Sequence, residues 1–95
     1  MGERQTKLLQ YLYEKIQAYP DKENQVCFVY SDYEIINGET VKDDDIIEIN
    51  KDILFLHENG YVQYPKMKDL HIVAAWITIT EKTIEYFKTK ENTKQ

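Results

Sequence analysis

Residues 43–64 read DDDIIEINKDILFLHENGYVQY, and the predicted arrangement of the rest of the chain follows from this segment. Its apolar residues recur at helical spacing: Ile46, Ile49, Ile53 and Leu56. Three aspartates at 43–45 open the pattern, where a helix N-terminus favours negative charge. Asn59 and Gly60 follow the last apolar residue, which is where a left-handed C-terminal cap is usually found. The stretch therefore predicts a helix that begins at Asp43, stops at Gly60 and leads into a strand over 61–64.

The chain before this stretch begins with another amphipathic pattern, over residues 3–19. Its apolar stripe predicts a helix and consists of Leu8, Leu9, Leu12, Tyr13, Ile16 and Tyr19. Pro20 ends that helix, because the residue before a proline is pushed out of the helical region. Residues 26–30, VCFVY, are β-branched and aromatic and predict a short buried strand. Cys27 is then expected to be a small core residue.

Residues 31–38 have two interpretations. Ser31 and Glu34 have the spacing of a capping box, and Gly38 offers a stop, which together predict a short helix with Ile35 and Ile36 turned inward. Alternatively, residues 27–30 pair with 33–36 in a β-hairpin. The agreement between cap and stop favours the helix.

The C-terminal third predicts two strands and a helix. Residues 61–64 and 70–80 are β-rich and are joined by a polar turn, so they are expected to form a β-hairpin. Thr80 is a suitable N-cap for a helix over 81–90 that docks Ile84 and Phe87. One domain over residues 1–90 and a frayed tail over 91–95 follow from this order.

Two blocks of the sequence resemble one protein family. The runs ILFLHENGYV at 53–62 and ITITEKTIEYF at 77–87 resemble, in the same order, two recurrent blocks of small winged-helix proteins of bacteria and their phages. The resemblance implies an α+β, winged-helix-like fold with three N-terminal helices, a short strand, a β-hairpin wing and a C-terminal helix. Relatives in this family include transcriptional regulators, so it also implies binding of duplex DNA by the third helix and the wing. Thr83 departs from the family, which usually has glycine there.

The composition bounds the class of protein. With 95 residues, 42% hydrophobic and 31% charged, the chain is typical of one globular, water-soluble domain. No apolar run approaches the length of about 18 residues that a membrane span needs. The single cysteine excludes an intrachain disulfide, and together with the absence of a secretory apolar segment it predicts a cytoplasmic location.

The charge balance bears on DNA binding. The net charge is −5, but residues 1–63 carry 6 basic and 13 acidic side chains and residues 64–95 carry 6 basic and 4 acidic ones. An anionic partner is therefore expected to prefer the C-terminal third. The candidate nucleic-acid contacts are Lys51, Lys66, Lys68, Lys82 and Asn50. Binding through these residues is expected to be weak and dependent on salt.

The second functional hypothesis is a protein-interaction surface. The face of the third helix opposite its apolar stripe is acidic and is expected to repel phosphate. The same face presents a phenylalanine, and an exposed apolar side chain of this size indicates a contact with a partner. The candidate contacts to a host factor or a second copy of the chain are Asp44, Glu48, Asp52, Phe55 and Tyr64. Eight tyrosines exceed what a small core absorbs, and tyrosine is common at interfaces. The alternative is that Phe55 and Trp76 fill gaps in the core.

Catalytic and metal chemistry have no motif in this sequence. The histidines, His57 and His71, stand outside any recognisable motif; His57 is expected to bond a backbone carbonyl at the edge of the core, and His71 to face solvent. One cysteine and two separated histidines cannot make a structural zinc site, and three glycines form no phosphate loop. The sequence predicts no enzyme, no cofactor and no metal.

Overall fold

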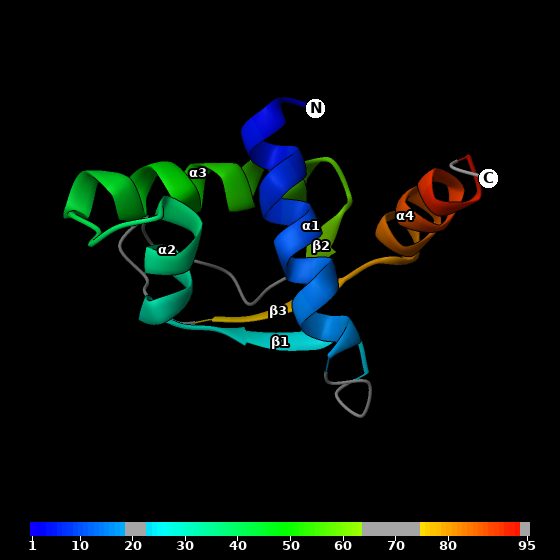
Figure 1. Cartoon of the computed structure of the whole chain (residues 1–95), viewed down its shortest axis with the longest axis horizontal. Coiled ribbons are helices and arrows are strands. Elements are labelled where there is room, and N and C mark those ends of the chain that lie inside the picture. Colours follow the sequence, from blue (N-terminus) through cyan, green and yellow to red (C-terminus); the bar gives the residue numbers. More distant parts are fainter. Residues whose placement is uncertain (19–22, 64–74, 94–95) are drawn as a thin grey trace.

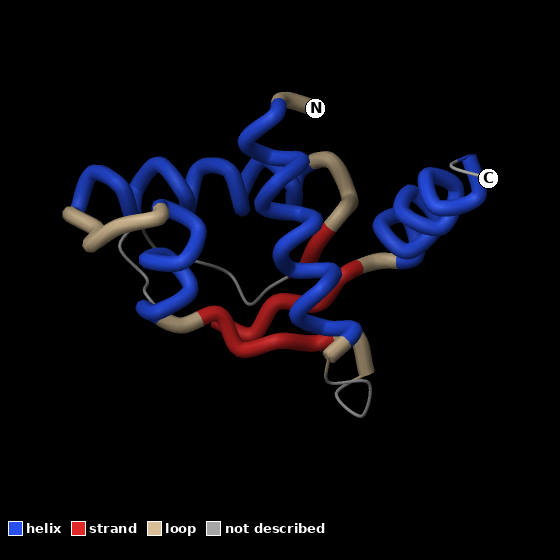
Figure 2. The backbone as a smooth tube through the Cα atoms, in the orientation of Figure 1, coloured by secondary structure: helices blue, strands red, loops and turns tan. Residues whose placement is uncertain are grey.

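The chain is seen in a computed structural model that describes residues 1–18, 23–63 and 75–93. Within these residues it folds into four helices and a three-stranded antiparallel sheet, in the order α1, β1, α2, α3, β2, β3, α4 (Figure 1). The prediction of an α+β fold is confirmed at this level. Strands β1 and β3 run along one side of the molecule and the helices lie on the other (Figure 2).

Helix α1 (Glu3–Gln17) buries the predicted stripe, namely Leu8, Leu9, Leu12 and Ile16. The helix ends at Gln17, with Ala18 as its C-cap, two residues before the predicted end. Tyr19 and Pro20 themselves lie outside the described residues.

The sheet has the strand order β1-β3-β2. Strand β1 (Gln25–Phe28) pairs with β3 (Ala75–Ile79), with Val26 opposite Ile77. Strand β2 (Val62–Gln63) pairs with the other edge of β3. The predicted antiparallel pairing of these two C-terminal strands is confirmed. The predicted basic turn over 65–69, residues 70–74 with His71, and Tyr64 lie outside the described residues.

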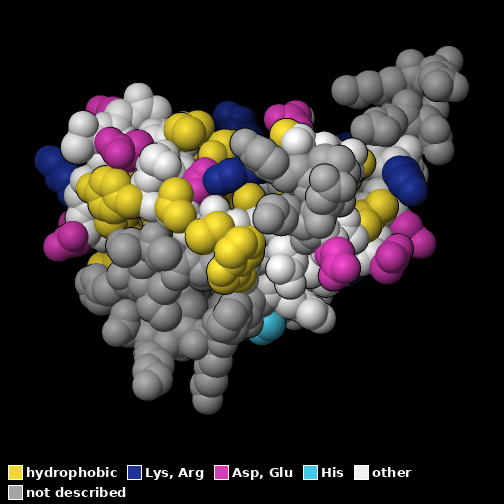
Figure 3. Space-filling view, turned by 90° about the horizontal axis from the view of Figure 1, so that it is seen from below, with side chains coloured by type: hydrophobic (Ala, Val, Ile, Leu, Met, Phe, Trp, Pro, Cys, Tyr) yellow, Lys and Arg dark blue, Asp and Glu magenta, His cyan; other side chains and the backbone are white. Residues whose placement is uncertain are grey.

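The two faces of the sheet differ. Val26, Phe28, Ile77 and Ile79 are buried against the helices, and the residues between them face the other way, as the two-residue period of a strand requires. Cys27 and Trp76 are register partners on that outer face. Cys27 is half-buried, so the prediction that it is a core residue is wrong. Figure 3 looks at the molecule from this side and shows hydrophobic side chains at the surface.

Helix α2 (Tyr30–Asn37) settles the alternative at 31–38, and the hairpin interpretation is wrong. The predicted N-cap at Ser31 is also wrong, because Val29 is the residue that precedes the helix. The backbone N–H of Val29 donates to the Asp32 carboxylate at 2.7 Å. Gly38 ends the helix at a positive φ of 82°, as predicted. The helix begins two residues earlier than the predicted cap implies. Tyr33 is buried in the core and Ile35 is 63% exposed, so the prediction that Ile35 is turned inward is wrong.

Helix α3 (Asp43–Glu58) matches its predicted start and stop. All four apolar residues of the predicted stripe are buried, and Gly60 follows at a φ of 81°. The Asp45 carboxylate accepts the backbone N–H of Lys42 at 2.9 Å, which caps the first turn. His57 Nδ1 lies 3.1 Å from the Val62 carbonyl oxygen, as predicted, although the His57 side chain is exposed and not at the core edge.

Helix α4 (Glu81–Thr93) closes the core. The Phe87 ring stacks on Tyr13 of α1 with centroids 4.6 Å apart, and Ile84 packs against the core. Thr83 is fully buried and donates its hydroxyl to the Tyr61 carbonyl at 2.6 Å, a bond that glycine cannot make. Residues 91–93 continue the helix instead of joining the predicted tail, since no glycine or proline interrupts them.

Candidate interaction surface

The solvent-facing side of α3 is acidic. The helix carries six carboxylates against one lysine, Lys51. Asp44 and Glu48 are exposed one turn apart, and Phe55 is 38% exposed further along the helix. Trp76, on the outer face of the sheet, is 51% exposed. The alternative in which Phe55 and Trp76 fill the core is therefore wrong.

The N-terminus of α1 partly neutralises this acidic side. The Arg4 guanidinium lies 2.6 Å from Glu48 and 3.0 Å from Asp52. Gln5 donates a further hydrogen bond to Asp52 at 2.8 Å. The hydrogen bond to Glu48 and the charge of Asp52 raise the pKa of Arg4 above its ordinary value. Asp52, half-buried in this arrangement, joins α1 to α3, whereas Glu48 keeps much of its surface in solvent.

A cleft lies where α1, the end of α2 and the first half of α3 meet, and we call it the α1–α3 cleft. Its volume is about 520 Å³. Apolar side chains form part of its wall: Leu8, Ile36 and Ile49. Four carboxylates line it, Asp44, Asp45, Glu48 and Asp52, together with Arg4, Lys7 and Asn37. The cleft therefore combines apolar surface with an excess of negative charge.

Asn50 does not belong to any exposed surface. Its side chain is fully buried, and its Oδ1 accepts a hydrogen bond from the Tyr33 hydroxyl. Burial, together with the charge of Asp32, outweighs that bond and raises the pKa of Tyr33 to about 12. Asn50 thus joins α3 to α2 inside the protein, and the prediction that it contacts nucleic acid is wrong.

The predicted basic strip is only partly within the described residues. Lys51 is exposed on α3. Lys82 donates to the Asn59 carbonyl at 2.7 Å, and its ammonium lies 4.4 Å from the centroid of the Tyr61 ring. Lys82 therefore binds the chain that follows α3, where a cation is favoured by the helix dipole. Lys66 and Lys68 lie outside the described residues.

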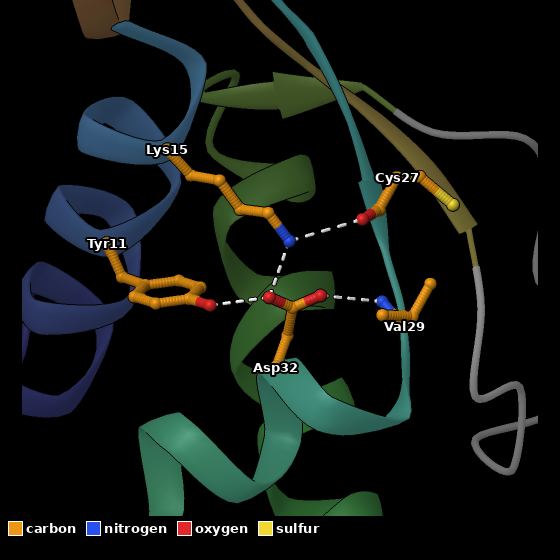
Figure 4. Close-up of polar contacts among 5 residues, drawn as sticks. All are labelled: Tyr11, Lys15, Cys27, Val29 and Asp32. Atoms are coloured by element: carbon orange, nitrogen blue, oxygen red, sulfur yellow. Dashed lines mark hydrogen bonds and ion pairs between the residues drawn. The ribbon is translucent and has the colours of Figure 1, made fainter. Parts of the chain in front are cut away.

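A buried ion pair that no sequence pattern predicts connects α1, β1 and α2 (Figure 4). Asp32 is 2% exposed and accepts hydrogen bonds from three groups. The Tyr11 hydroxyl and the Lys15 ammonium both lie 2.5 Å from Oδ1, and the Val29 N–H lies 2.7 Å from Oδ2. Lys15 also donates to the Cys27 carbonyl at 3.4 Å. Tyr11 and Lys15 are far from Asp32 in the sequence, so no periodic pattern predicts these contacts.

The protonation of this cluster follows from its contacts. Burial by itself raises the pKa of Asp32, but the hydrogen bonds from Lys15, Tyr11 and Val29 outweigh it, so the pKa lies below its ordinary value. Burial and the bond to Asp32 raise the pKa of Tyr11. At neutral pH the carboxylate is charged and the phenol is neutral. Because each group already has a partner, the cluster serves to hold the three elements together.

Comparison of the chain with protein-family models, with curated proteins and with solved structures finds no match. No set of three or more His, Cys, Asp or Glu side chains within residues 1–18, 23–63 and 75–93 is placed to hold a metal ion. Among the helices described above, none is both long and apolar enough to cross a membrane. Proposals about function therefore rest on the surface of α3 and on the order of the elements.

Proposed function

We propose that this chain is a small, cytoplasmic, non-catalytic regulatory module of the winged-helix type, and that its third helix binds a protein partner. The winged-helix part is supported by the element order helix, strand, helix, helix, strand, strand, helix and by the pairing of β2 with β3. The resemblance of residues 53–62 and 77–87 to that family supports it independently. The non-catalytic part is supported by the lack of any motif around the two histidines and the cysteine.

The observation that carries the protein-binding proposal is the exposed side of α3. In DNA-binding helix-turn-helix proteins this helix enters the major groove, among phosphates. Here it carries six carboxylates and one lysine, a balance that repels phosphate. Exposed Phe55, beside this charge, is an aromatic side chain of the kind that anchors protein interfaces. Because interfaces pair surfaces of opposite charge, we expect the partner to present a basic surface to the acidic side of α3.

A second copy of the chain is a poor partner for this face. In a two-fold symmetric dimer the same patch meets itself, so the acidic patch of one copy, which includes Asp44 and Glu48, would lie against the acidic patch of the other. Like charges brought together in an interface weaken it. The partner of this face is therefore a different protein, one that carries a basic surface.

Capture experiments test this proposal. Immobilised wild-type protein is expected to retain a basic partner from a lysate of its source cells, and Phe55→Ala is expected to retain at least about fivefold less of it, since anchor residues contribute more than 1 kcal/mol. The matched control is Ile35→Ala, which removes an even more exposed apolar side chain on α2. The retained protein is measured by quantitative mass spectrometry.

Each outcome of this experiment bears on the proposal. A basic protein lost with Phe55→Ala and kept with Ile35→Ala supports it. Identical sets of retained proteins for wild type and both variants contradict it, as does a Phe55-dependent partner with an acidic surface.

DNA binding is the second candidate, and the element order favours it, because by resemblance the regulators of this family share that order. Among the described residues, Lys51 on α3 is exposed and could contact a DNA phosphate. Lys82 already donates a hydrogen bond to the Asn59 carbonyl. DNA is the less favoured partner because α3 carries six carboxylates and only one lysine, Lys51.

A further inference from the structure

The carboxylates of the α1–α3 cleft already hold one cation of the chain itself. Arg4 places its guanidinium against both Glu48 and Asp52, yet 57% of its side chain remains exposed. The geometry of these carboxylates therefore suits a guanidinium group, and the contact is open to competition from solvent. The Arg4–Glu48 pair is exposed on both sides, and such pairs contribute little to stability, so a competing cation can replace Arg4 at Glu48 at little cost.

Two further groups that line the cleft lack partners within the part of the chain that the structure describes. The Asp44 carboxylate makes no hydrogen bond or ion pair there. The Asn37 side-chain nitrogen is buried without an acceptor. A buried amide donor without an acceptor is unfavourable by about 1–3 kcal/mol. Because that nitrogen has almost no accessible surface, a ligand in the cleft does not reach it in this side-chain conformation, and the unpaired group open to a ligand is the Asp44 carboxylate.

We infer that the α1–α3 cleft receives a basic peptide segment of the partner protein, in which arginine or lysine alternates with aliphatic residues. The cations would meet Asp44 and Glu48, and the aliphatic side chains would cover Leu8, Ile36 and Ile49. This inference rests on the proposed function and names the chemistry of its partner. It adds a site that Phe55 does not line.

The test uses a short fluorescent peptide of alternating arginine and leucine as the probe, with a peptide of alternating glutamate and leucine as its control. Fluorescence anisotropy is expected to show binding of the arginine peptide alone. Asp44→Asn should weaken it by about fivefold, the effect of losing one exposed ion pair. Asp43→Asn is the matched control, because Asp43 lies in the same helical turn, carries the same charge and does not line the cleft. It should change affinity by less than about twofold.

Arg4→Ala supplies a second readout. It removes the internal cation and leaves Glu48 and Asp52 to the peptide, so affinity is expected to rise. Weaker binding to Arg4→Ala would overturn the inference, and so would equal losses with Asp43→Asn and Asp44→Asn, which indicate general attraction to an acidic helix.

Failure of this inference can be told apart from failure of the proposed function. If no arginine peptide binds while a partner is still captured through Phe55, the cleft is not the site and the proposed function stands. If the peptide binds with the expected dependence on Asp44 while no partner depends on Phe55, the cleft is supported and the protein-binding role of the Phe55 surface is contradicted.

Discussion

Replacing Asp32 with alanine is expected to lower the free energy of unfolding by about 3 kcal/mol, among the largest effects of any single substitution in this chain. The change removes a carboxylate that is 2% exposed and leaves Tyr11, Lys15 and the Val29 N–H without their common acceptor. Unpaired buried donors are unfavourable, and the first turn of α2 also loses its cap. Urea denaturation followed by circular dichroism measures the loss.

Two controls separate the charge of Asp32 from its hydrogen bonds. Tyr11→Phe removes only one donor and should cost about 1 kcal/mol. The second control is pH. Because the folded-state pKa of Asp32 is lowered, its contribution is complete above the unfolded pKa of about 4 and is lost as the pH falls through the folded value. The stability difference between wild type and Asp32→Ala should therefore narrow below about pH 4. A difference that stays constant into strong acid would contradict a charged Asp32.

Leu56→Ala is expected to cost about 3 kcal/mol, whereas Phe55→Ala, one residue earlier, should cost at most about 1 kcal/mol. Leu56 is fully buried, so its truncation leaves a cavity, while Phe55 is 38% exposed. Comparing the stability losses of these two variants therefore tests which side of α3 faces the core. Urea denaturation of both variants measures the two losses.

The opposite ranking would contradict the orientation of α3. If Phe55→Ala destabilised the protein as much as Leu56→Ala, Phe55 would belong to the core, and reduced capture by that variant would no longer indicate a contact with a partner. Circular dichroism of both variants before denaturation checks that each is folded.

Helix α3 was predictable from sequence because its signals are local and agree. The apolar period, the aspartates at its start and the glycine after its end all lie within one stretch of the chain. Helix α2 was harder. Its start depends on Asp32 accepting the Val29 N–H, and the same carboxylate binds Tyr11 and Lys15 from α1. Contacts that join distant parts of the chain leave no periodic pattern, so the buried ion pair could not be inferred.

The candidate site was predictable in part. The acidic side of α3 and the exposure of Phe55 follow from one helical wheel. The error at Asn50 was avoidable, since Asn50 lies four residues after Ile46 and three before Ile53 and therefore shares their buried face. The role of Arg4 was not predictable, because its partners lie on a helix more than forty residues away.

A gel-shift titration with random duplex DNA tests most directly whether the acidic side of α3 excludes nucleic acid. At about 50 mM salt, where phosphate contacts are strongest, we expect no retarded band at micromolar protein. A band that appears at about 50 mM salt, fades at about 200 mM salt and is abolished by Lys51→Glu would contradict it, since α3 would then bind DNA despite its six carboxylates.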